Sequence, residues 1–261
     1  MFLFRRLLER SASKENRRPR MRLDPLRFSA IYAIGDVHGC MGLLRKAYDR
    51  ILQDDPPSPG KKLVVFLGDY VDRGEDSKAV LEFLTRPCTE GVEHVCLCGN
   101  HDAEFFRFLL NPKATMSWLE FGGVETLASY GIDADHILKS GGGLPVLDRV
   151  VKQAVPAHHM SLLASLPIML EVGRLVFVHA GIRPGVPLVE QTDHDLLWIR
   201  EPFLTSGPKL PVFVFHGHTV QPEPTFGPRR VAIDTGAYAT GRLTVLRISE
   251  GKIRVLHQSQ Q

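Results

Sequence analysis

The sequence is poor in cysteine, with four among 261 residues and no CxxC pair. Cys96 and Cys98 lie in a strand-like apolar run, where a free cysteine behaves as a small core residue. This usage is typical of a reducing compartment, and we expect a cytoplasmic protein.

Long apolar runs are also missing. The opening segment, residues 1–10, is broken by arginines after too short a stretch to form a signal peptide or a membrane span. A short amphipathic helix there would bind a membrane surface only weakly. We therefore expect no transmembrane segment.

The net charge is small and unevenly placed. The formal charge is +3, but the first 22 residues hold eight Lys or Arg and two Glu, so the remainder is slightly acidic. An acidic body argues against a broad nucleic-acid-binding face. We expect residues 1–28 to form a basic, flexible lead-in. Residues 29–261 are long and apolar enough to form a single domain.

Five apolar runs rich in β-branched residues predict buried strands. Helical spacing between the first three predicts βαβ units and therefore an α/β fold with parallel strands. The strands are expected at 31–34, 63–67, 95–98, 175–178 and 212–215, and the helices at 41–52 and 77–84. Residues 103–173 change to helical segments with a glycine-rich loop at 141–143, which we interpret as a cap. Strands are expected again at 231–233, 243–248 and 253–257.

Three short strings place carboxylate, amide and imidazole groups directly after apolar runs. They are GDVHG at 35–39, GDYVDRG at 68–74 and GNHD at 99–102. Two later strand ends add His179, and then His216 or His218. Ligand sites in such sheets lie beyond the carboxyl ends of the strands, so we expect these segments to converge.

The convergent set fits a site for two divalent metal ions. Oxygen and imidazole ligands suit hard ions such as Mn²⁺. The candidate ligands are Asp36 and His38 for one ion, Asn100, His179 and His218 for the second, and Asp69 as the bridge. Two such ions generate hydroxide at neutral pH and clamp a phosphoryl group, which predicts a phosphoesterase.

Further side chains near the ligands suit phosphoryl chemistry. His101 is next to the candidate ligand Asn100 but is not itself assigned to a metal ion, which makes it the candidate general acid. Asp72 is placed to hold its other ring nitrogen. Arg73 and Arg200 are candidates for binding phosphate oxygens, together with Asn100. Each residue alone is more often structural, but five coincident placements at strand ends favour the functional interpretation.

The motifs GDxHG, GDxVDRG and GNH resemble the signature of the phosphoprotein-phosphatase branch of the calcineurin-like metallophosphoesterases. VHAG at 178–181 and GHT at 217–219 resemble its remaining metal-histidine motifs, and residues 196–200 its segment with a phosphate-binding arginine. The chain most resembles compact bacterial members. These include serine/threonine phosphatases of the bacteriophage lambda type and symmetrical diadenosine tetraphosphate hydrolases.

This resemblance implies a four-layer fold of two mixed β-sheets flanked by helices. It also implies a dinuclear metal centre that hydrolyses phosphomonoesters or pyrophosphates. It favours His218 as the ligand and leaves His216 as a strand-end residue or an outer partner. The chain has Asp102 where the family usually has glutamate after GNH. We expect this difference to affect the arrangement of the residues around the ligands rather than catalysis itself.

The first functional hypothesis is a protein serine/threonine phosphatase, in which a metal-bridging hydroxide attacks and His101 protonates the leaving group. The cofactors would be two divalent ions, manganese first, with iron or zinc as alternatives. The alternative is a symmetrical bis(5'-nucleosyl)-tetraphosphatase acting on a dinucleotide. A third interpretation is a non-catalytic module that binds metal or phosphate. The presence of His101, Asp72 and Arg73 argues against it, because such a module could lose these residues.

Two features are set aside as structural. Aromatic residues of the cap could stack an adenine, but their helical spacing favours core packing. They are Phe105, Phe106, Trp118, Phe121 and Tyr130. Asp234-Thr235-Gly236 matches the aspartic-protease tripeptide, but that chemistry needs two such carboxylates.

Overall fold

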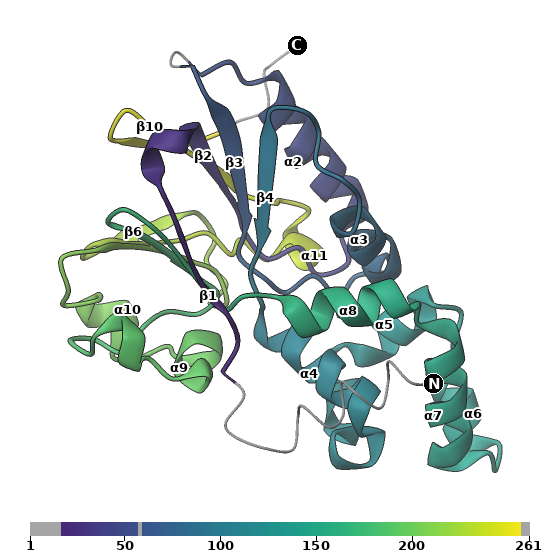
Figure 1. Ribbon diagram of the computed structural model, residues 1–261. Helices are drawn as coiled ribbons and strands as arrows, with labels where there is room; N and C mark the ends of the chain where they lie inside the picture. Colours follow the sequence, from purple (N-terminus) through teal and green to yellow (C-terminus); the bar gives the residue numbers. More distant parts are fainter. Residues whose placement is uncertain (1–16, 57–58, 257–261) are drawn as a thin grey trace.

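Two β-sheets packed face to face form the centre of the protein (Figure 1). The computed structural model describes residues 17–56 and 59–256. The first sheet has five strands in the order β11-β10-β2-β3-β4. They are β2 (Phe28–Ile34), β3 (Lys61–Phe66), β4 (Val92–Cys96), β10 (Val245–Ser249) and β11 (Lys252–Val255). β2, β3 and β4 are parallel, whereas β10 is antiparallel to β2 and to β11, so the sheet is mixed.

Two helices connect the parallel strands, as the βαβ pattern predicts. They are α2 (Met41–Gln53) and α3 (Ser77–Leu84). On α2, Leu44, Ala47 and Ile51 recur at helical spacing and are fully buried. The apolar stripe of each helix therefore covers the outer face of the five-stranded sheet.

The second sheet has six strands in the order β1-β5-β6-β7-β9-β8 and is also mixed. They are β1 (Arg20–Leu23), β5 (Met169–Val172), β6 (Leu175–Val178), β7 (Phe213–His216), β8 (Thr225–Gly227) and β9 (Arg230–Ala232). Short helices α9 (Asp193–Trp198) and α10 (Phe203–Ser206) pack on its outer face through Leu196 and Phe203. Helices, two sheets and helices make the four layers that the resemblance implies.

Alternate residues of the two sheets fill the space between them. Ile31, Ala33 and Val65 from the first sheet belong to one buried cluster with Phe177 and Phe215 from the second. The two phenylalanine rings stack with centroids 4.7 Å apart. Each fully buried large apolar side chain contributes about 1.5–3 kcal/mol. This core fixes the strand ends of both sheets relative to one another.

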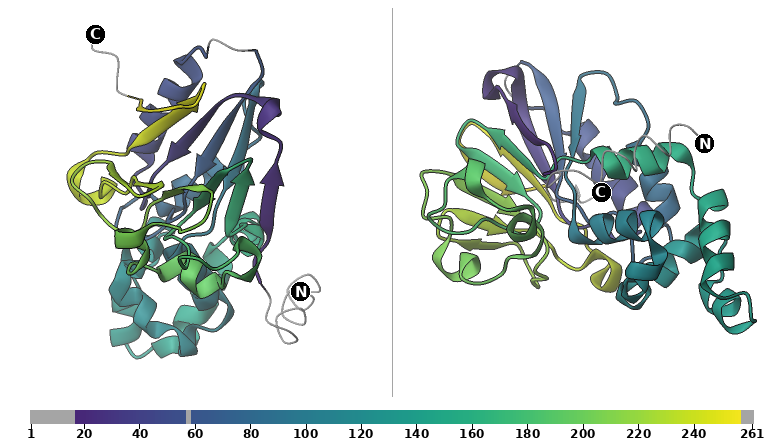
Figure 2. Two further views of the ribbon diagram at one scale, coloured as in Figure 1. Left: turned by 90° about the vertical axis from the view of Figure 1, so that its left-hand side faces the viewer. Right: turned by 60° about the horizontal axis from the view of Figure 1, so that its bottom comes forward.

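A group of helices lies between β4 and β5, in the segment that was predicted to form a cap, and we call this group the cap (Figure 2). They are α4 (Asn100–Leu110), η2 (Pro112–Ala114), η3 (Met116–Phe121), α5 (Gly123–Ser129), α6 (Ala134–Lys139), α7 (Gly143–Ala154) and α8 (Ala157–Ser165). The sequence did not predict α6 and α7. Gly141 and Gly142 connect α6 to α7 as the predicted glycine loop, Gly143 begins α7, and Pro145 lies in its first turn, where proline is tolerated.

The amino-terminal segment differs from the predicted lead-in. β1 pairs in parallel with β5, so Arg20–Leu23 is an edge strand of the six-stranded sheet. Arg20 forms an ion pair with Asp193 at 2.8 Å, and Arg22 one with Glu171 at 3.0 Å. The basic side chains thus have acidic partners, which a count of charges along the sequence does not reveal. The predicted flexibility of residues 1–16 lies outside the described residues.

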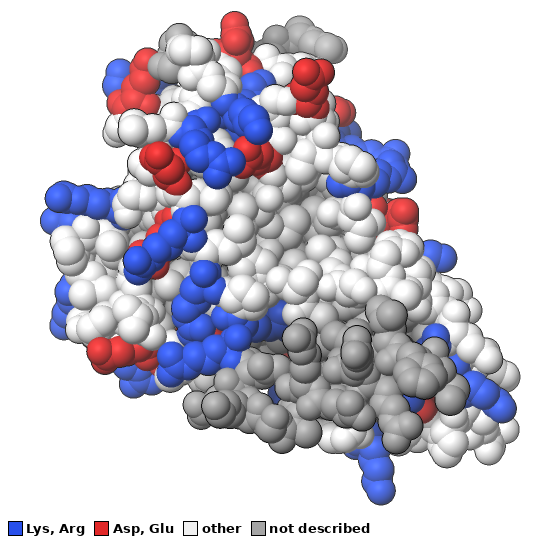
Figure 3. Space-filling view, in the orientation of Figure 1, with Lys and Arg blue, Asp and Glu red and all other residues white. Residues whose placement is uncertain are grey.

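Figure 3 shows basic and acidic side chains interspersed over one face of the molecule, with a denser group of basic side chains beside the grey residues. All four cysteines are free. Among the residues that the structure describes, no helix is long and apolar enough to cross a membrane.

Candidate metal centre

The loops after five strands bring the predicted ligands together. Asp36 and His38 follow β2, Asp69 follows β3, and Asn100 begins α4 just beyond β4. From the other sheet, His179 follows β6 and His218 follows β7. All six side chains are buried. The carboxyl ends of strands in two sheets thus supply one cluster.

Asp69 lies at the centre of this cluster. Its Oδ2 is 3.5 Å from His38 Nε2 and 3.4 Å from His179 Nε2. The carboxylate belongs to two overlapping groups of possible metal ligands, one with His38 and His101 and one with His179 and His218. This position suits a bridging ligand.

Asn100 completes the second group. Its Oδ1 is 2.7 Å from His179 Nε2 and 2.9 Å from His218 Nδ1. Burial lowers the pKa of His38 and His218 to about 3, so both rings are neutral and can offer a lone pair. Neutral imidazole is the form that ligates metals.

Two buried polar atoms at the site have no hydrogen-bond partner: Asp36 Oδ1 and His218 Nε2. Burial, with the charges of Asp234 and Asp69, raises the pKa of Asp36 well above its usual range. A buried carboxylate that lacks a counter-charge is costly unless a cation binds it. The oxygen and imidazole donors therefore fit divalent metal ions.

The backbone at the site is strained. Five candidate residues have φ between +42° and +72°, a region that L-residues rarely adopt. They are His38, Asp69, Asp72, Arg73 and His218. Such strain costs about 1–3 kcal/mol per residue and concentrates at functional sites. Here the left-handed conformation turns the loop after each strand sharply toward the cluster.

Glycines allow carboxylates to come close to the backbone. A Cβ on Gly217 would overlap Asp36 Oδ1, and a Cβ on Gly99 would overlap Asp69 Oδ1 and the Asp69 nitrogen. No larger residue fits at either position without moving a candidate ligand. The glycines of the motifs thus have a steric explanation.

His101 and Asp72 form a buried pair beside the ligands. His101 Nδ1 is 2.7 Å from Asp72 Oδ2. Burial alone lowers the pKa of His101, but the carboxylates of Asp69 and Asp72 outweigh burial and raise it. These carboxylates therefore favour the protonated form of the ring.

The cap holds Asp72 in place. Trp118 Nε1 donates to Asp72 Oδ2 at 2.8 Å, and Thr126 Oγ1 donates to Oδ1 at 2.7 Å. Sequence reasoning gave neither residue this role, because the partners lie 46 and 54 positions away along the chain. Trp118 is also stacked on Phe105 at 5.0 Å. Phe105, Trp118 and Tyr130 are buried and Phe106 packs against them, as their spacing predicts, but Phe121 is 59% exposed, so the prediction is wrong for that residue.

Arg73 lies among the ligand rings. Its guanidinium nitrogens are 3.0 Å from His38 Nε2 and 3.1 Å from His101 Nε2. Tyr238 of α11 (Ala237–Thr240) packs under Arg73, with the guanidinium carbon 4.9 Å from the ring centroid. The sequence gave no signal for Tyr238. Arg200 is exposed, and its charge acts on His218.

Asp102 clamps two motifs together. It accepts hydrogen bonds from the backbone nitrogens of Asp69 and Tyr70 at 2.8 Å and of Gly99 at 2.9 Å. Burial and the Asp69 charge raise the pKa of Asp102 to about 7. The shorter aspartate side chain therefore still reaches the backbone of both motifs. Its three hydrogen bonds hold these loops although glutamate is the usual residue at this position.

His216 and Asp234 lie beside the cluster. His216 is buried with its Nε2 3.3 Å from Arg230 and its ring against Phe203, and it belongs to neither group of possible metal ligands. Asp234 accepts from the Gly236 nitrogen at 2.9 Å, and its charge reaches Asp36. Of the two histidines of β7 and its loop, His218 is the one that faces the ligands.

Comparisons with known proteins show the family to which the chain belongs. Residues 29–239 match the family described as calcineurin-like phosphoesterase, so the chain belongs to that family. It is 28% identical over 239 residues to the asymmetrical bis(5'-nucleosyl)-tetraphosphatase PrpE of Anoxybacillus flavithermus, covering 83% of this chain and 89% of that protein. The protein is therefore a metal-dependent phosphoesterase.

Solved structures show the same fold. A candidate diadenosine tetraphosphatase superposes with a TM-score of 0.61 at 20% identity, covering 90% of this chain and 96% of that one. The cold-active protein-tyrosine phosphatase of a psychrophilic Shewanella superposes with a TM-score of 0.61 at 16% identity, covering 94% and 85%. At these identities the likeness concerns the fold alone.

The Asp102 clamp predicts a large effect on stability. Asp102→Ala leaves three backbone N–H groups without their acceptor, and each buried orphan costs about 1–3 kcal/mol. We expect the free energy of unfolding to fall by about 3 kcal/mol or more in urea titrations. The exposed Asp135→Ala should change it by about 0.5 kcal/mol or less. Similar effects from both variants would contradict the clamp.

Proposed function

We propose that the enzyme hydrolyses its substrate at a dinuclear centre, with His101 as the general acid. The position of Asp69 between two ligand groups, with the His101–Asp72 pair beside it, is the observation that carries this proposal. The proposed ligands are Asp36, His38 and Asp69 for one ion, and Asp69, Asn100, His179 and His218 for the other.

The metal ions would neutralise phosphate charge and lower the pKa of a water molecule. Arg73 and Arg200 bind phosphate oxygens through their guanidinium groups, and the Asn100 side-chain amide can donate to one. His101 Nε2 gives its proton to the leaving oxygen. Asp72 orients the ring through Nδ1 and stabilises its protonated form.

For the metal identity, we propose manganese first, with iron or zinc as alternatives, because the ligands are oxygen and imidazole. The free thiols fit the cytoplasmic location expected from the sequence.

For the substrate, we propose a dinucleoside tetraphosphate. The relative named as an asymmetrical bis(5'-nucleosyl)-tetraphosphatase supports this choice over most of the chain. The sequence hypothesis placed phosphoserine and phosphothreonine first and a symmetrical tetraphosphatase second. Asymmetrical cleavage of diadenosine tetraphosphate gives ATP and AMP, and symmetrical cleavage gives two ADP, so product analysis distinguishes them.

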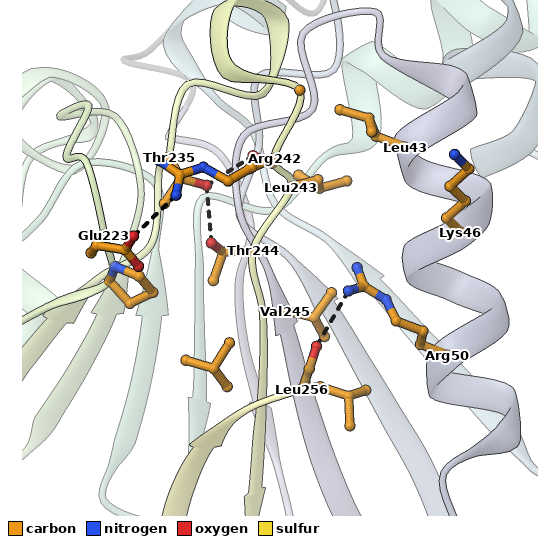
Figure 4. A pocket seen from close by; sticks show the side chains of 13 residues that line it. Leu43, Lys46, Arg50, Glu223, Thr235, Arg242, Leu243, Thr244, Val245 and Leu256 are labelled. Atoms are coloured by element: carbon orange, nitrogen blue, oxygen red, sulfur yellow. Dashed lines mark hydrogen bonds and ion pairs between the residues drawn. The ribbon is translucent and has the colours of Figure 1, made fainter. Parts of the chain in front are cut away.

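A pocket lined by α2, β10 and the segment after α11 could take the distal nucleotide (Figure 4). It has a volume of about 410 Å³, with Lys46 and Arg50 on one wall and Arg242 on the other, where Arg242 forms an ion pair with the lining residue Glu223 at 3.0 Å. Leu43 and Leu243 line its apolar part. Basic groups around an apolar floor suit the phosphates and base of a nucleotide.

α11 separates this pocket from the metal centre. Tyr238 on α11 lies 5.4 Å from the His38 ring, measured between centroids, while Gly241 and Arg242 directly after α11 line the pocket. Thr235, next to Asp234, lines the pocket as well. The proposal therefore requires the ligand to pass α11 between the metals and the pocket.

Protein serine/threonine phosphatase activity is the second candidate. The motifs GDVHG, GDYVDRG and GNH favour it, since they resemble the signature of the phosphoprotein-phosphatase branch. A non-catalytic module is disfavoured, because His101, Asp72 and Arg73 lie together beside the ligands.

Metal content separates the proposed roles. With Mn²⁺ and p-nitrophenyl phosphate, His101→Ala should lower kcat by about 10²–10⁴-fold and keep the metal content near that of the wild type. Asp69→Ala should lose both activity and metal. Metal analysis of the two variants checks this, and the opposite pattern would refute the assigned roles.

A side-by-side assay tests the substrate. We expect kcat/KM with Mn²⁺ to be higher for diadenosine tetraphosphate than for a phosphoserine peptide, with products resolved by chromatography. A preference for the phosphopeptide would favour the second candidate. Hydrolysis of neither compound, nor of p-nitrophenyl phosphate, would refute both.

The pocket gives a sharper test. Lys46→Ala with Arg242→Ala should raise KM for diadenosine tetraphosphate about tenfold, which corresponds to the loss of about 1.4 kcal/mol. KM for p-nitrophenyl phosphate should stay unchanged, because that compound does not reach the pocket. Arg45→Ala, on α2 but outside the lining, is the control. Equal changes with both substrates would contradict the placement of the distal nucleotide.

A further inference from the structure

A second group of metal-ligand side chains lies away from the strand ends. It joins Glu82 on α3 to His158 and His159 in the first turn of α8. Figure 1 shows α3, α5 and α8 near one another on the side of the molecule that carries the cap. The centre described above uses loops after β2, β3, β4, β6 and β7, so the two groups share no residue.

The Glu82 carboxylate lies at a distance from both imidazoles that suits a tetrahedral metal site. Glu82 Oε2 is 2.9 Å from His158 Nε2 and 3.2 Å from His159 Nε2. All three atoms lie within 4.8 Å of one another. Zinc–nitrogen and zinc–oxygen bonds of about 2.0–2.1 Å place tetrahedral ligands about 3.3 Å apart. Small movements would therefore suffice to bind an ion.

The buried histidine is oriented by an outer partner. His159 is fully buried, and its Nδ1 lies 2.7 Å from the hydroxyl oxygen of Tyr130. With a metal on Nε2, Nδ1 carries the proton and donates it to the Tyr130 oxygen. Metal-binding histidines usually have such a partner on the second nitrogen.

The other two ligands leave the site open to solvent. The side chains of His158 and Glu82 are 51% and 46% exposed. Glu75 and Asp76 line a small cavity with Glu82, together with Lys78, whose ammonium lies over the Tyr130 ring. Acidic groups outnumber the lysine, so a cation can approach, and water can fill the fourth position.

We propose that Glu82, His158 and His159 bind a Zn²⁺ ion at a third metal site, separate from the dinuclear centre. Two imidazoles and a carboxylate are the ligands that zinc accepts in open sites. The ion would tie α3 to α8. α3 also carries Ser77 and α5 carries Thr126, whose hydroxyls both accept from the Asp72 nitrogen. A bound ion would therefore stiffen the helices that hold the His101–Asp72 pair.

Metal stoichiometry tests this proposal. The full chain is dialysed against Zn²⁺, and bound zinc is measured by mass spectrometry. We expect Glu82→Gln and His158→Gln to bind one equivalent less than the wild type. Both residues are partly exposed, so the fold should survive, which circular dichroism checks. His136→Gln, an exposed histidine on α6, is the matched control. Equal zinc in the wild type and both cluster variants would overturn the proposal.

Thermal melting provides the second readout. In the enzyme loaded with Mn²⁺, added Zn²⁺ should raise Tm in the wild type and in His136→Gln but less in the two cluster variants, because ligands that bind the native state stabilise it. The same rise in Tm in all four proteins would contradict the site. Glu82 and the two histidines would then be joined by hydrogen bonds alone, without a metal ion. Hydrolysis of p-nitrophenyl phosphate with Mn²⁺ should persist in the cluster variants. Its absence from the wild type would refute the proposed function without affecting the zinc count.

Discussion

The position of the Asp69 carboxylate is the constraint on which the rest of the site depends. One oxygen accepts from the His101 backbone nitrogen at 3.0 Å, and the other faces His38 and His179. The side chain reaches this place because its backbone is left-handed, with φ of +52°. Gly99 leaves room for it, and Asp102 holds its nitrogen. A backbone conformation, rather than a side-chain rotamer alone, therefore brings two ligand groups together.

The second constraint is the packing of the two sheets. Asp36 and Asn100 follow strands of the five-stranded sheet, whereas His179 and His218 follow strands of the six-stranded sheet. The proposed ligand set is complete only when the apolar core between the sheets is formed. Ions that bind this set bind the folded state alone, so metal binding and folding are linked.

The sequence predicted the parts that depend on local pattern. The apolar runs located β2, β3, β4, β6 and β7, and the polar residues after them are those that the structure brings together. β1 was missed, because its alternate charged residues become a strand only by pairing with β5. The roles of Trp118, Thr126 and Tyr238 could not be predicted either, because they depend on how the cap and α11 fold back over the motifs. The sequence showed only that Asp102 replaces the usual glutamate. Its hydrogen bonds to three backbone nitrogens could not be predicted, because they form only when the two loops come together.

Anomalous X-ray diffraction from crystals grown with Mn²⁺ tests the central claim most directly. The account predicts two manganese peaks on either side of the Asp69 carboxylate, one beside Asp36 and His38 and the other beside Asn100, His179 and His218. A single peak, or two peaks that do not share Asp69, would contradict the account.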